Sequence, residues 1–206
     1  MCKRARHLKN FAELVAAAIP DRAKDKPFEI WFQDEARVGQ QGALTRLWAV
    51  RGSRPRAARD RRFDWAYIFG AVCPARAATA AFVAPKANTW AMQNLDAISR
   101  NVAEGARAVV VVDGAGWHGA LDLTVPSNIS LLALPPYSPE LNSIENVWQH
   151  LRQNFLSNRV FEDYDPIVDA CCKAWLAFIA APDVVRCRPL RRRTLMGEGQ
   201  CLERLA

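Results

Sequence analysis

A run of four valines, Val109 to Val112, constrains the fold of this chain more than any other feature of its sequence. A strand with only one face buried alternates apolar and polar residues, because successive side chains point to opposite faces. A continuous apolar run bounded by glycines is instead typical of a central strand buried on both faces. We therefore expect a sheet with helices packed on both of its sides.

The spacing of apolar residues predicts further strands and helices along the chain. Three strands follow one another early, which predicts an antiparallel meander with an arginine-rich loop between its second and third strands. Later strands alternate with helices, so the fold class is α/β with a mixed sheet. The expected strands are Phe28–Gln33, Thr45–Val50, Trp65–Cys73, Arg107–Asp113 and Asn128–Pro135, and the expected helices include Asn88–Gly105 and Asp165–Pro182. In the second of these helices, Asp165 is expected at the N-cap, Pro166 at the first helical position and Pro182 at the end.

The segment LPPYSPELNSIENVW, Leu134 to Trp148, predicts a strand exit followed by a helix. Its prolines fix an extended exit, Ser138 is expected to cap the helix, and Pro139 to take the first helical position. At about 100° per residue, Glu145 lies roughly 80° from the centre of the apolar stripe and hence at the margin of the buried face. The same position also suits an ordinary exposed glutamate. The stripe consists of Leu141, Ile144, Trp148, Leu151 and Phe155.

Two aspartates follow predicted strands. Asp34 continues the series of Phe28 and Phe32, so we expect it at the strand's end on the inward side, with Glu35 facing away. Asp113 ends the valine run, and ligands of open α/β sheets gather outside the carboxyl ends of such strands. Either aspartate alone also suits turn chemistry. Together with Glu145 they form a set of oxygen ligands, which favours Mg²⁺ or Mn²⁺ over zinc.

The net charge of +7 is unevenly distributed. Arginine clusters suit a phosphate backbone, because the guanidinium group matches phosphate oxygens and keeps its charge. Two such clusters occur, one between Arg51 and Arg62 and a second between Arg186 and Arg193. The alternative interpretations are a solvated loop for the first and a disordered basic tail for the second. The first cluster, whose only acid is Asp60, contains Arg51, Arg54, Arg56, Arg59, Arg61 and Arg62.

Several classes of protein are not indicated. No apolar run is long enough to span a bilayer, and Glu13 interrupts the apolar part of the N-terminus, which argues against a signal peptide. The six cysteines form no CxxC pair, so neither a zinc site nor a disulfide framework is expected, and a reducing cytoplasm fits best. We expect Cys171 and Cys172 to be buried small apolar residues. Core positions are also expected for Trp48, Trp148 and Trp175.

Three segments, FQDEA, VVVVDGAGWH and LPPYSPELNSIENVW, resemble the catalytic blocks of mariner-like bacterial insertion-sequence transposases. These enzymes are members of the DDE superfamily and have an RNase H-like core, and the resemblance covers roughly Phe28 to Val185. It implies a sheet with a three-strand antiparallel meander plus two parallel strands. It also implies that Asp34, Asp113 and Glu145 are the catalytic triad and bind two Mg²⁺ (or Mn²⁺) ions. The implied activity is DNA strand cleavage followed by strand transfer at the ends of an insertion sequence.

The same resemblance implies partners and an organisation. The partners are DNA, as terminal inverted repeats and target, a second copy in a homodimer, and a helix-turn-helix segment encoded upstream. The expected location is the cytoplasm, in association with the nucleoid. The expected parts are a basic, helical lead-in at 1–27, the catalytic domain at 28–185 and a basic, disordered or frameshifted tail at 186–206. Auxiliary roles near the metal or DNA are expected for His118, Asn142 and Asn146. An exposed structural role for His118, and helix-end capping or solvent exposure for the two asparagines, are the alternatives.

Two other interpretations fit the same residues. One is a non-catalytic remnant of a transposase that binds DNA or dimerises, which predicts salt-dependent DNA binding without metal-dependent cleavage. The other keeps the RNase H-like fold and makes the chain a general nuclease or junction resolvase. Indifference to the sequence of the terminal repeats distinguishes this last interpretation from a transposase.

Overall fold

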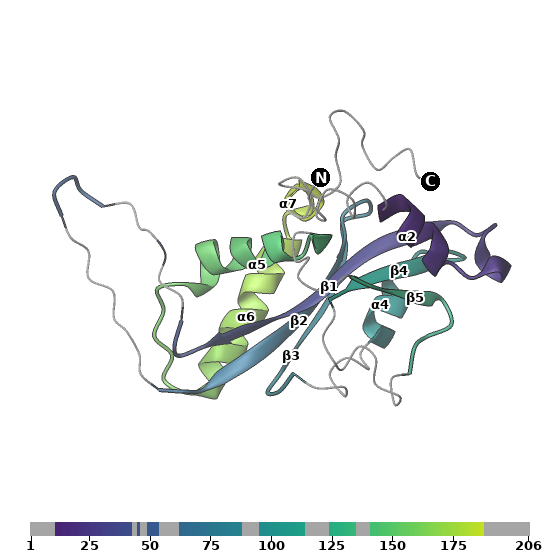
Figure 1. Ribbon diagram of the computed structural model, residues 1–206. Helices are drawn as coiled ribbons and strands as arrows, with labels where there is room; N and C mark the ends of the chain where they lie inside the picture. The colour runs from purple at the N-terminus through teal and green to yellow at the C-terminus, as the bar shows by residue number, and fades with distance from the viewer. Residues whose placement is uncertain are drawn as a thin grey trace, which may run out of the picture.

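The computed structural model describes residues 11–42, 45, 49–53, 62–87, 95–113, 124–134 and 141–187, except for the side chain of Arg22. They contain a five-stranded sheet of order β3-β2-β1-β4-β5 (Figure 1). β1, β2 and β3 are antiparallel neighbours, whereas β4 runs parallel to β1 and β5 runs parallel to β4. The predicted mixed sheet, a meander plus two parallel strands, is confirmed. The strands are β1 (Phe28–Gly39), β2 (Trp65–Cys73), β3 (Ala78–Ala84), β4 (Arg107–Val112) and β5 (Ile129–Ala133).

The meander uses a different set of strands from the predicted one. β3 takes the third place, while Ala49 and Val50 lie outside any strand and Trp48 lies outside the described residues. The arginine-rich segment consequently connects the first and second strands of the meander, not the second and third. The sequence of β3, ATAAFVA, is mostly alanine, so its strand signal is weak. Pairing with β2 stabilises this strand, and the rings of Phe69 on β2 and Phe82 on β3 stack with their centroids 4.9 Å apart.

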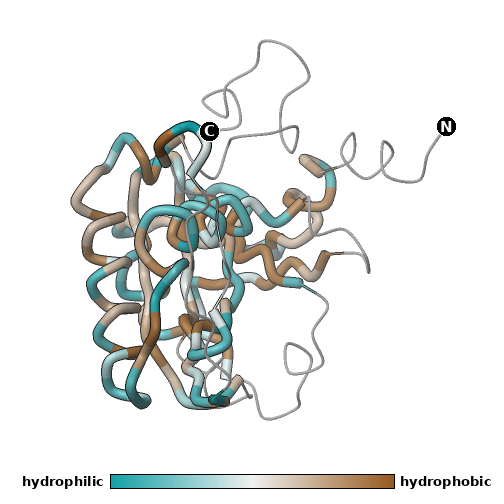
Figure 2. Tube along the Cα trace, turned by 90° about the vertical axis from the view of Figure 1, so that its left-hand side faces the viewer, coloured by the Kyte–Doolittle hydropathy of each residue, from teal (hydrophilic) through white to brown (hydrophobic). Residues whose placement is uncertain are grey.

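Helices cover both faces of the sheet, as the valine run predicts (Figure 1). Val109 and Val111 belong to the core cluster on one face, whereas Val110 and Val112 belong to the cluster on the other, and all four are almost fully buried. In Figure 2 the hydrophobic stretches gather along the strands, and the helical turns alternate between hydrophobic and hydrophilic residues. The first face carries α2 (Phe11–Ala18), α5 (Glu145–Leu151) and α6 (Tyr164–Ile179), and the second carries α4 (Leu95–Asn101).

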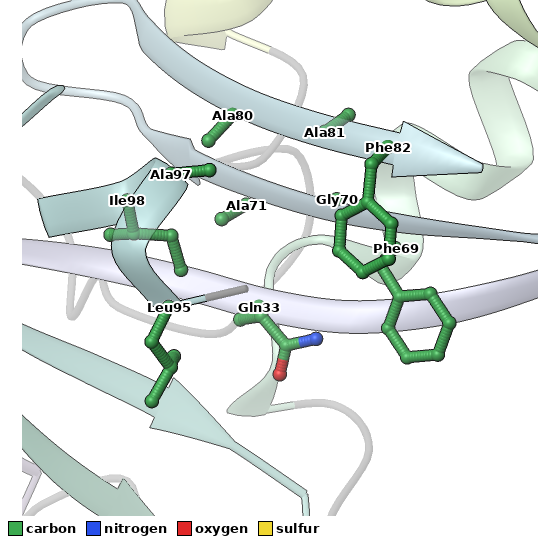
Figure 3. Close-up of a pocket in the computed structure, with 10 residues that line it drawn as sticks. All are labelled: Gln33, Phe69, Gly70, Ala71, Ala80, Ala81, Phe82, Leu95, Ala97 and Ile98. Atoms are coloured by element: carbon green, nitrogen blue, oxygen red, sulfur yellow. The ribbon is translucent and has the colours of Figure 1, made fainter. Parts of the chain in front are cut away.

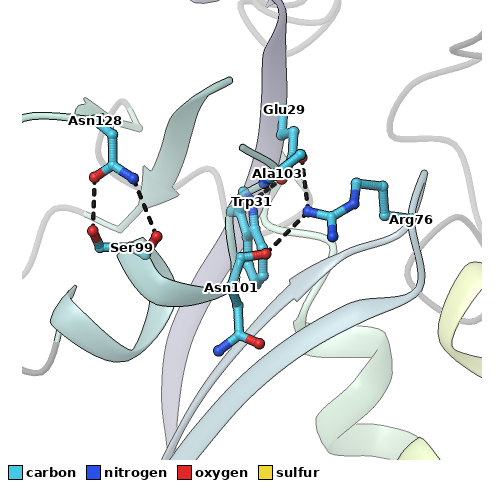
Figure 4. A network of polar contacts seen from close by, with 7 residues as sticks. All are labelled: Glu29, Trp31, Arg76, Ser99, Asn101, Ala103 and Asn128. Carbon is cyan, nitrogen blue, oxygen red and sulfur yellow. Dashed lines mark hydrogen bonds and ion pairs between the residues drawn. The ribbon is translucent and has the colours of Figure 1, made fainter. Parts of the chain in front are cut away.

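A polar network fastens α4 to the sheet (Figure 4). The Glu29 carboxylate accepts hydrogen bonds from Trp31 Nε1 at 2.9 Å, from Arg76 at 2.8 Å and from the backbone N–H of Ala103 at 3.1 Å. Arg76 also donates to the carbonyl of Asn101 at 3.0 Å. The end of α4 is therefore tied both to β1 and to the β2–β3 turn. A second pair of bonds, between Ser99 and Asn128, ties α4 to the start of β5.

Two helix boundaries differ from those predicted. α4 ends at Asn101 before Gly105, and the predicted part at 88–94 lies outside the described residues. α6 begins at Tyr164 with Asp163 as its N-cap, so Asp165 lies inside the helix, and Pro182 opens α7 (Pro182–Cys187) instead of ending α6. A proline is accepted in the first turn of a helix because its missing N–H has no partner there.

The prediction for the cysteine pair is half wrong. Cys171 is buried in α6, but Cys172 is exposed. Neighbouring residues on a helix are about 100° apart, so both side chains cannot face the same core. The core positions of Trp148 and Trp175 are confirmed.

The lead-in packs on the same core as the sheet. Phe11 and Val15 of α2 are buried, and the ring of Phe11 stacks on that of Phe32 at 6.5 Å. The boundary expected at residue 28 stays a prediction, as does the one at 185. Among the helices of the described ranges, none combines the length and apolar character needed to cross a membrane.

Candidate active site

Asp34 lies inside β1 and not at its end. The strand continues to Gly39 because its pairing with β2 continues as far as Gly39 and Trp65. The inward direction of Asp34 is as predicted: its side chain is 8% exposed and faces α5. There, Trp148 donates its indole N–H to Oδ2 of Asp34 at 3.0 Å. A carboxylate is thus held in the interior with a neutral donor as its side-chain partner.

The other two residues of the predicted triad contribute to the electrostatic surroundings of Asp34. Burial raises the pKa of Asp34 to about 7, against the effects of the Trp148 hydrogen bond and of the Glu35 backbone N–H, which lower it. The negative charges of Glu145 and Asp113 raise this pKa further. Both carboxylates are therefore close enough to Asp34 to repel its charge.

The register of the parallel strands explains the position of Asp113. β1 and β4 pair as far as Phe32 and Val111. Asp34 and Asp113 each lie two residues further on, and a step of two keeps a side chain on the same face. The two aspartates therefore lie on neighbouring strands at the same rim of the sheet. Asp113 itself follows β4 and is half-buried.

Glu145 is the first residue of α5 and is exposed. The predicted helix start at Pro139 and its cap at Ser138 lie outside the described residues, and the helix of the structure begins six residues later. Residues 141–144 are buried ahead of it, and Asn142 donates from Nδ2 to the carbonyl of Gln33 at 2.8 Å. That bond fastens the turn before α5 to β1, directly beside Asp34. Of the predicted apolar stripe, Leu141, Ile144, Trp148 and Leu151 are buried and Phe155 is partly buried.

The predicted auxiliary residues have different outcomes. Asn142 is buried and anchors the start of α5, whereas Asn146 is half-buried on the first turn of that helix. His118 lies outside the described residues, as do Arg54, Arg56, Arg59 and Arg61. Arg51 is exposed, and Arg62 donates to the carbonyls of Phe161 and Glu162.

Glu35 is a fourth acidic residue near this site; it points to the face opposite to that of Asp34, as predicted, but that face is covered as well. It is half-buried, and its Oε2 is buried without a hydrogen-bond partner among the described residues. Burial raises its pKa to about 7, and the charges of Asp34 and Asp113 add to this effect. The valine run held the missing signal, because a sheet covered on both faces also buries an acid that points to its second face.

The carboxylates of these residues suit a hard divalent cation, although their side chains do not surround a position for one. Within the described ranges, no three His, Cys, Asp or Glu side chains lie close enough together to hold a metal ion. The available donors are carboxylate oxygens, which Mg²⁺ and Mn²⁺ prefer. A cation beside Asp34 would also offset the repulsion that raises its pKa.

A groove extends from the C-terminal end of β1, beyond Asp34. It has a volume of about 430 Å³, within the usual range of ligand sites. The guanidinium of Arg37 lies over the ring of Trp65 at 5.2 Å, and the exposed fractions of Phe63 and Trp65 are 69% and 39%. We call it the β1 groove. Its lining consists of Arg37, Val38, Gly39, Gln41, Gly42, Phe63, Asp64, Trp65, Arg152, Leu156 and Ser157.

Gln40 fixes the two ends of the connection that borders the β1 groove. Its buried amide donates to the carbonyls of Phe161 and Glu162 at 3.1 and 3.2 Å, and its Oε1 accepts from the backbone N–H of Asp64 at 3.0 Å. The end of β1, the residues before β2 and the segment before α6 are thereby joined.

A second cavity lies between α4 and the sheet and is too small for a ligand. Its volume is about 20 Å³, space for about one water molecule. Figure 3 shows Gln33 among alanines and the rings of Phe69 and Phe82. The Oε1 atom of Gln33 is buried without a hydrogen-bond partner among the described residues.

Comparison with known proteins gives matches in sequence and in structure. A family model described as DDE superfamily endonuclease matches residues 29–168. The chain is 56% identical over 119 residues to the uncharacterized protein y4pE/y4sA of Sinorhizobium fredii, a match that covers 57% of this chain and 88% of that protein.

Similar solved structures are complexes of the Mos1 mariner transposase. The paired end complex with Mn has a TM-score of 0.63 at 17% identity, over 93% of this chain and 60% of that one. The paired end complex with Mg has a TM-score of 0.62 at 18% identity, over 93% and 59%. The Strand Transfer Complex has a TM-score of 0.61 at 17% identity, over 92% and 58%. The chain thus spans about three fifths of the Mos1 chains and shares their fold.

Proposed function

Because the chain belongs to the DDE superfamily endonuclease family, we propose that it is a transposase catalytic domain that cleaves DNA at the ends of an insertion sequence and joins them to target DNA. The observation that carries this proposal is the surroundings of Asp34. A buried carboxylate here experiences the charges of two others, which come from a neighbouring strand and from a helix. Such a group of acids destabilises a fold, and its presence is characteristic of a functional site.

In this proposal Asp34, Asp113 and Glu145 hold two Mg²⁺ or Mn²⁺ ions. Bound ions of this kind activate the attacking oxygen and stabilise the leaving oxygen of a phosphodiester. The protein then supplies position and charge, and no side chain forms a covalent bond to phosphate. Asp34 contributes a carboxylate with a fixed orientation, while the exposed Glu145 can approach it from the start of α5.

We further propose that one DNA strand occupies the β1 groove. Arg37 and Arg152 offer positive charge for phosphates, and the exposed rings of Phe63 and Trp65 offer surfaces on which bases stack. The groove begins at Arg37, three residues after Asp34 on β1, and we propose that DNA bound in it continues toward the acidic residues. Five arginines lie in the chain between Gly42 and Phe63 of the groove and are proposed as further phosphate contacts: Arg51, Arg54, Arg56, Arg59 and Arg61.

The partners of the complete enzyme are proposals as well. The chain spans about 60% of the Mos1 chain in the complex with Mn, which leaves the rest of that length without a counterpart here. We propose that a helix-turn-helix segment encoded upstream recognises the terminal repeats. A homodimer would bring two ends of the element together.

A cleavage assay tests the catalytic proposal. The chain, joined to any upstream helix-turn-helix segment, is incubated with Mg²⁺ and labelled DNA that carries the terminal repeats of its element. Nicking at the repeat ends is expected, and Asp113→Asn and Glu145→Gln should each abolish it, while Asp169→Asn on the exposed side of α6 should not. Nicking that persists unchanged in the Asp113 variant contradicts the assignment. Nicking that ignores the repeat sequence points to a general nuclease or resolvase.

A second candidate function is DNA binding without cleavage. The observation in its favour is that no three acidic side chains of the described part of the chain lie close enough to enclose an ion. In this case the wild-type chain binds DNA in a salt-dependent manner but releases no nicked product with either Mg²⁺ or Mn²⁺.

A further inference from the structure

Trp148 belongs to α5, the helix that carries Glu145, and contacts Asp34 of β1. It is 1% exposed, and its indole N–H donates to Oδ2 of Asp34 at 3.0 Å. Trp148 also follows Glu145 by three residues on α5, so the two side chains are less than one helical turn apart. One residue thus connects the start of α5 to the carboxylate on β1.

The sheet has a space shaped for this indole ring. Gly70 of β2 pairs with Asp34 in the register of the sheet. A Cβ atom at Gly70 would lie 2.6 Å from Cη2 of Trp148 and 2.8 Å from Cη2 of Trp175. Both distances are far below van der Waals contact, so only glycine admits the two rings at this point. The rings themselves pack at 6.1 Å with an angle of 43°.

The chemistry of the donor suits a metal ligand. An arginine or lysine in the place of Trp148 would neutralise Asp34 and compete with a cation. The indole N–H is a neutral donor, so it fixes one carboxylate oxygen and leaves the negative charge in place. Hydrogen bonds of this kind orient the ligands of metal sites.

We propose that Trp148 is a positioning residue for the catalytic carboxylates. Its N–H holds Asp34 in the orientation that a divalent cation requires, and its ring, seated over Gly70, sets the position of α5 and hence of Glu145. This inference rests on the proposed function, since it takes Asp34 as a metal ligand. The competing explanation is that the bond only satisfies a buried N–H in the core.

Binding of Mn²⁺ to the whole chain, followed by the electron paramagnetic resonance signal of the free ion, separates these explanations. Trp148→Phe keeps an aromatic ring and removes the donor. The matched control is Trp175→Phe, which alters the same pair of rings without affecting the bond to Asp34. We expect Trp148→Phe to weaken Mn²⁺ binding about 10- to 100-fold, the usual effect of losing a hydrogen bond to a metal ligand. Trp175→Phe should change the affinity less than about twofold.

Asp34→Asn distinguishes a failure of this inference from a failure of the proposed function. If wild type binds Mn²⁺ and Asp34→Asn does not, the ligand assignment stands. Equal affinities of wild type and Trp148→Phe then overturn the positioning role alone. If Asp34→Asn binds Mn²⁺ as wild type does, the proposed metal site is itself wrong, and the role of Trp148 is overturned with it.

The wild-type chain provides a second measurement in case Trp148→Phe does not fold. In a ¹⁵N–¹H spectrum, the indole signal of Trp148 should move as Mg²⁺ is added, while that of Trp175 should stay in place. Saturation with Mg²⁺ that moves neither signal, in a chain whose binding depends on Asp34, overturns the positioning role.

Discussion

Replacing Asp34 with asparagine should stabilise the folded chain while it abolishes cleavage. Asparagine has nearly the same shape as aspartate, and its carbonyl oxygen can still accept the hydrogen bond from Trp148. What it removes is a charge that the protein interior solvates poorly. The substitution therefore isolates the electrostatic cost of the site from its packing.

The pKa of Asp34 sets the size of the effect. It is about 7 in the folded chain, against an ordinary value of 3.8. Each unit of pKa corresponds to about 1.4 kcal/mol, so the ionised carboxylate lowers the free energy of unfolding by about 4 kcal/mol at pH 8. Relaxation of the neighbouring charges reduces this figure, and we expect a measured gain of about 2 to 4 kcal/mol for Asp34→Asn.

The direction of the pH dependence follows from the raised pKa. Between pH 4 and 7 the folded state holds a proton on Asp34 that the unfolded state has lost. The contribution of Asp34 to the free energy of unfolding is therefore most favourable below about pH 4, falls as the pH rises through this window, and is constant above pH 7. The difference between Asp34→Asn and wild type should be close to zero at pH 4 and reach its full size by pH 8.

Urea unfolding in EDTA at several pH values measures this difference. Asp169→Asn is the control, because Asp169 is exposed on α6 and its ion pair with Lys173 at 3.8 Å is also on the surface. It should change stability by less than about 0.5 kcal/mol at every pH. A gain for Asp34→Asn that is absent at pH 8, or equally large at pH 4, refutes the account of Asp34 as a desolvated carboxylate.

Three further substitutions test the supports of the site. Gln40→Ala leaves the backbone N–H of Asp64 without its partner and removes one of the two donors to the carbonyls of Phe161 and Glu162. It should lower the free energy of unfolding by about 1 to 3 kcal/mol in urea, whereas the exposed Gln41→Ala should have almost no effect. Gly70→Ala should cost about 1 to 3 kcal/mol or more in the same assay, because its Cβ meets two indole rings; an unchanged midpoint contradicts the packing described. Arg152→Ala should reduce the slope of log affinity for DNA against log salt concentration by about 1, while the exposed Arg100→Ala on α4 should leave it unchanged, and equal slopes for both remove Arg152 from the DNA path.

Local patterns were sufficient to predict the centre of the sheet. The valine run predicted a strand buried on both faces, and β4 is such a strand. The alternation of Phe28 and Phe32 predicted the inward direction of Asp34, which depends only on the period of two along a strand. The resemblance to a transposase family was carried by three short segments and led to the correct fold.

Interactions between distant residues account for what local patterns missed. The residues after Gln33 in β1 are polar or small apart from Val38, so the local sequence gives little strand signal, yet pairing with β2 extends the strand to Gly39. The alanines of β3 give little signal until their partners in β2 are known. The start of α5 depends in the same way on Asn142, which bonds to the carbonyl of Gln33.

The sequence predicted which residues form the candidate site but not their pKa values, because these depend on how deeply the acidic residues are buried. The period of two along a strand decides which face a carboxylate points to, and this period can be derived from local spacing. The pKa of Asp34 depends instead on the desolvation produced by α5, α6 and the neighbouring strands together, and that of Glu35 on the covering of the opposite face. Both acids oppose folding at neutral pH, so the surrounding core must supply the stability they remove. Each valine of β4 packs into one of the two apolar clusters that cover the sheet, so the strand that most constrains the fold also contributes to the core that offsets the cost of the buried acids.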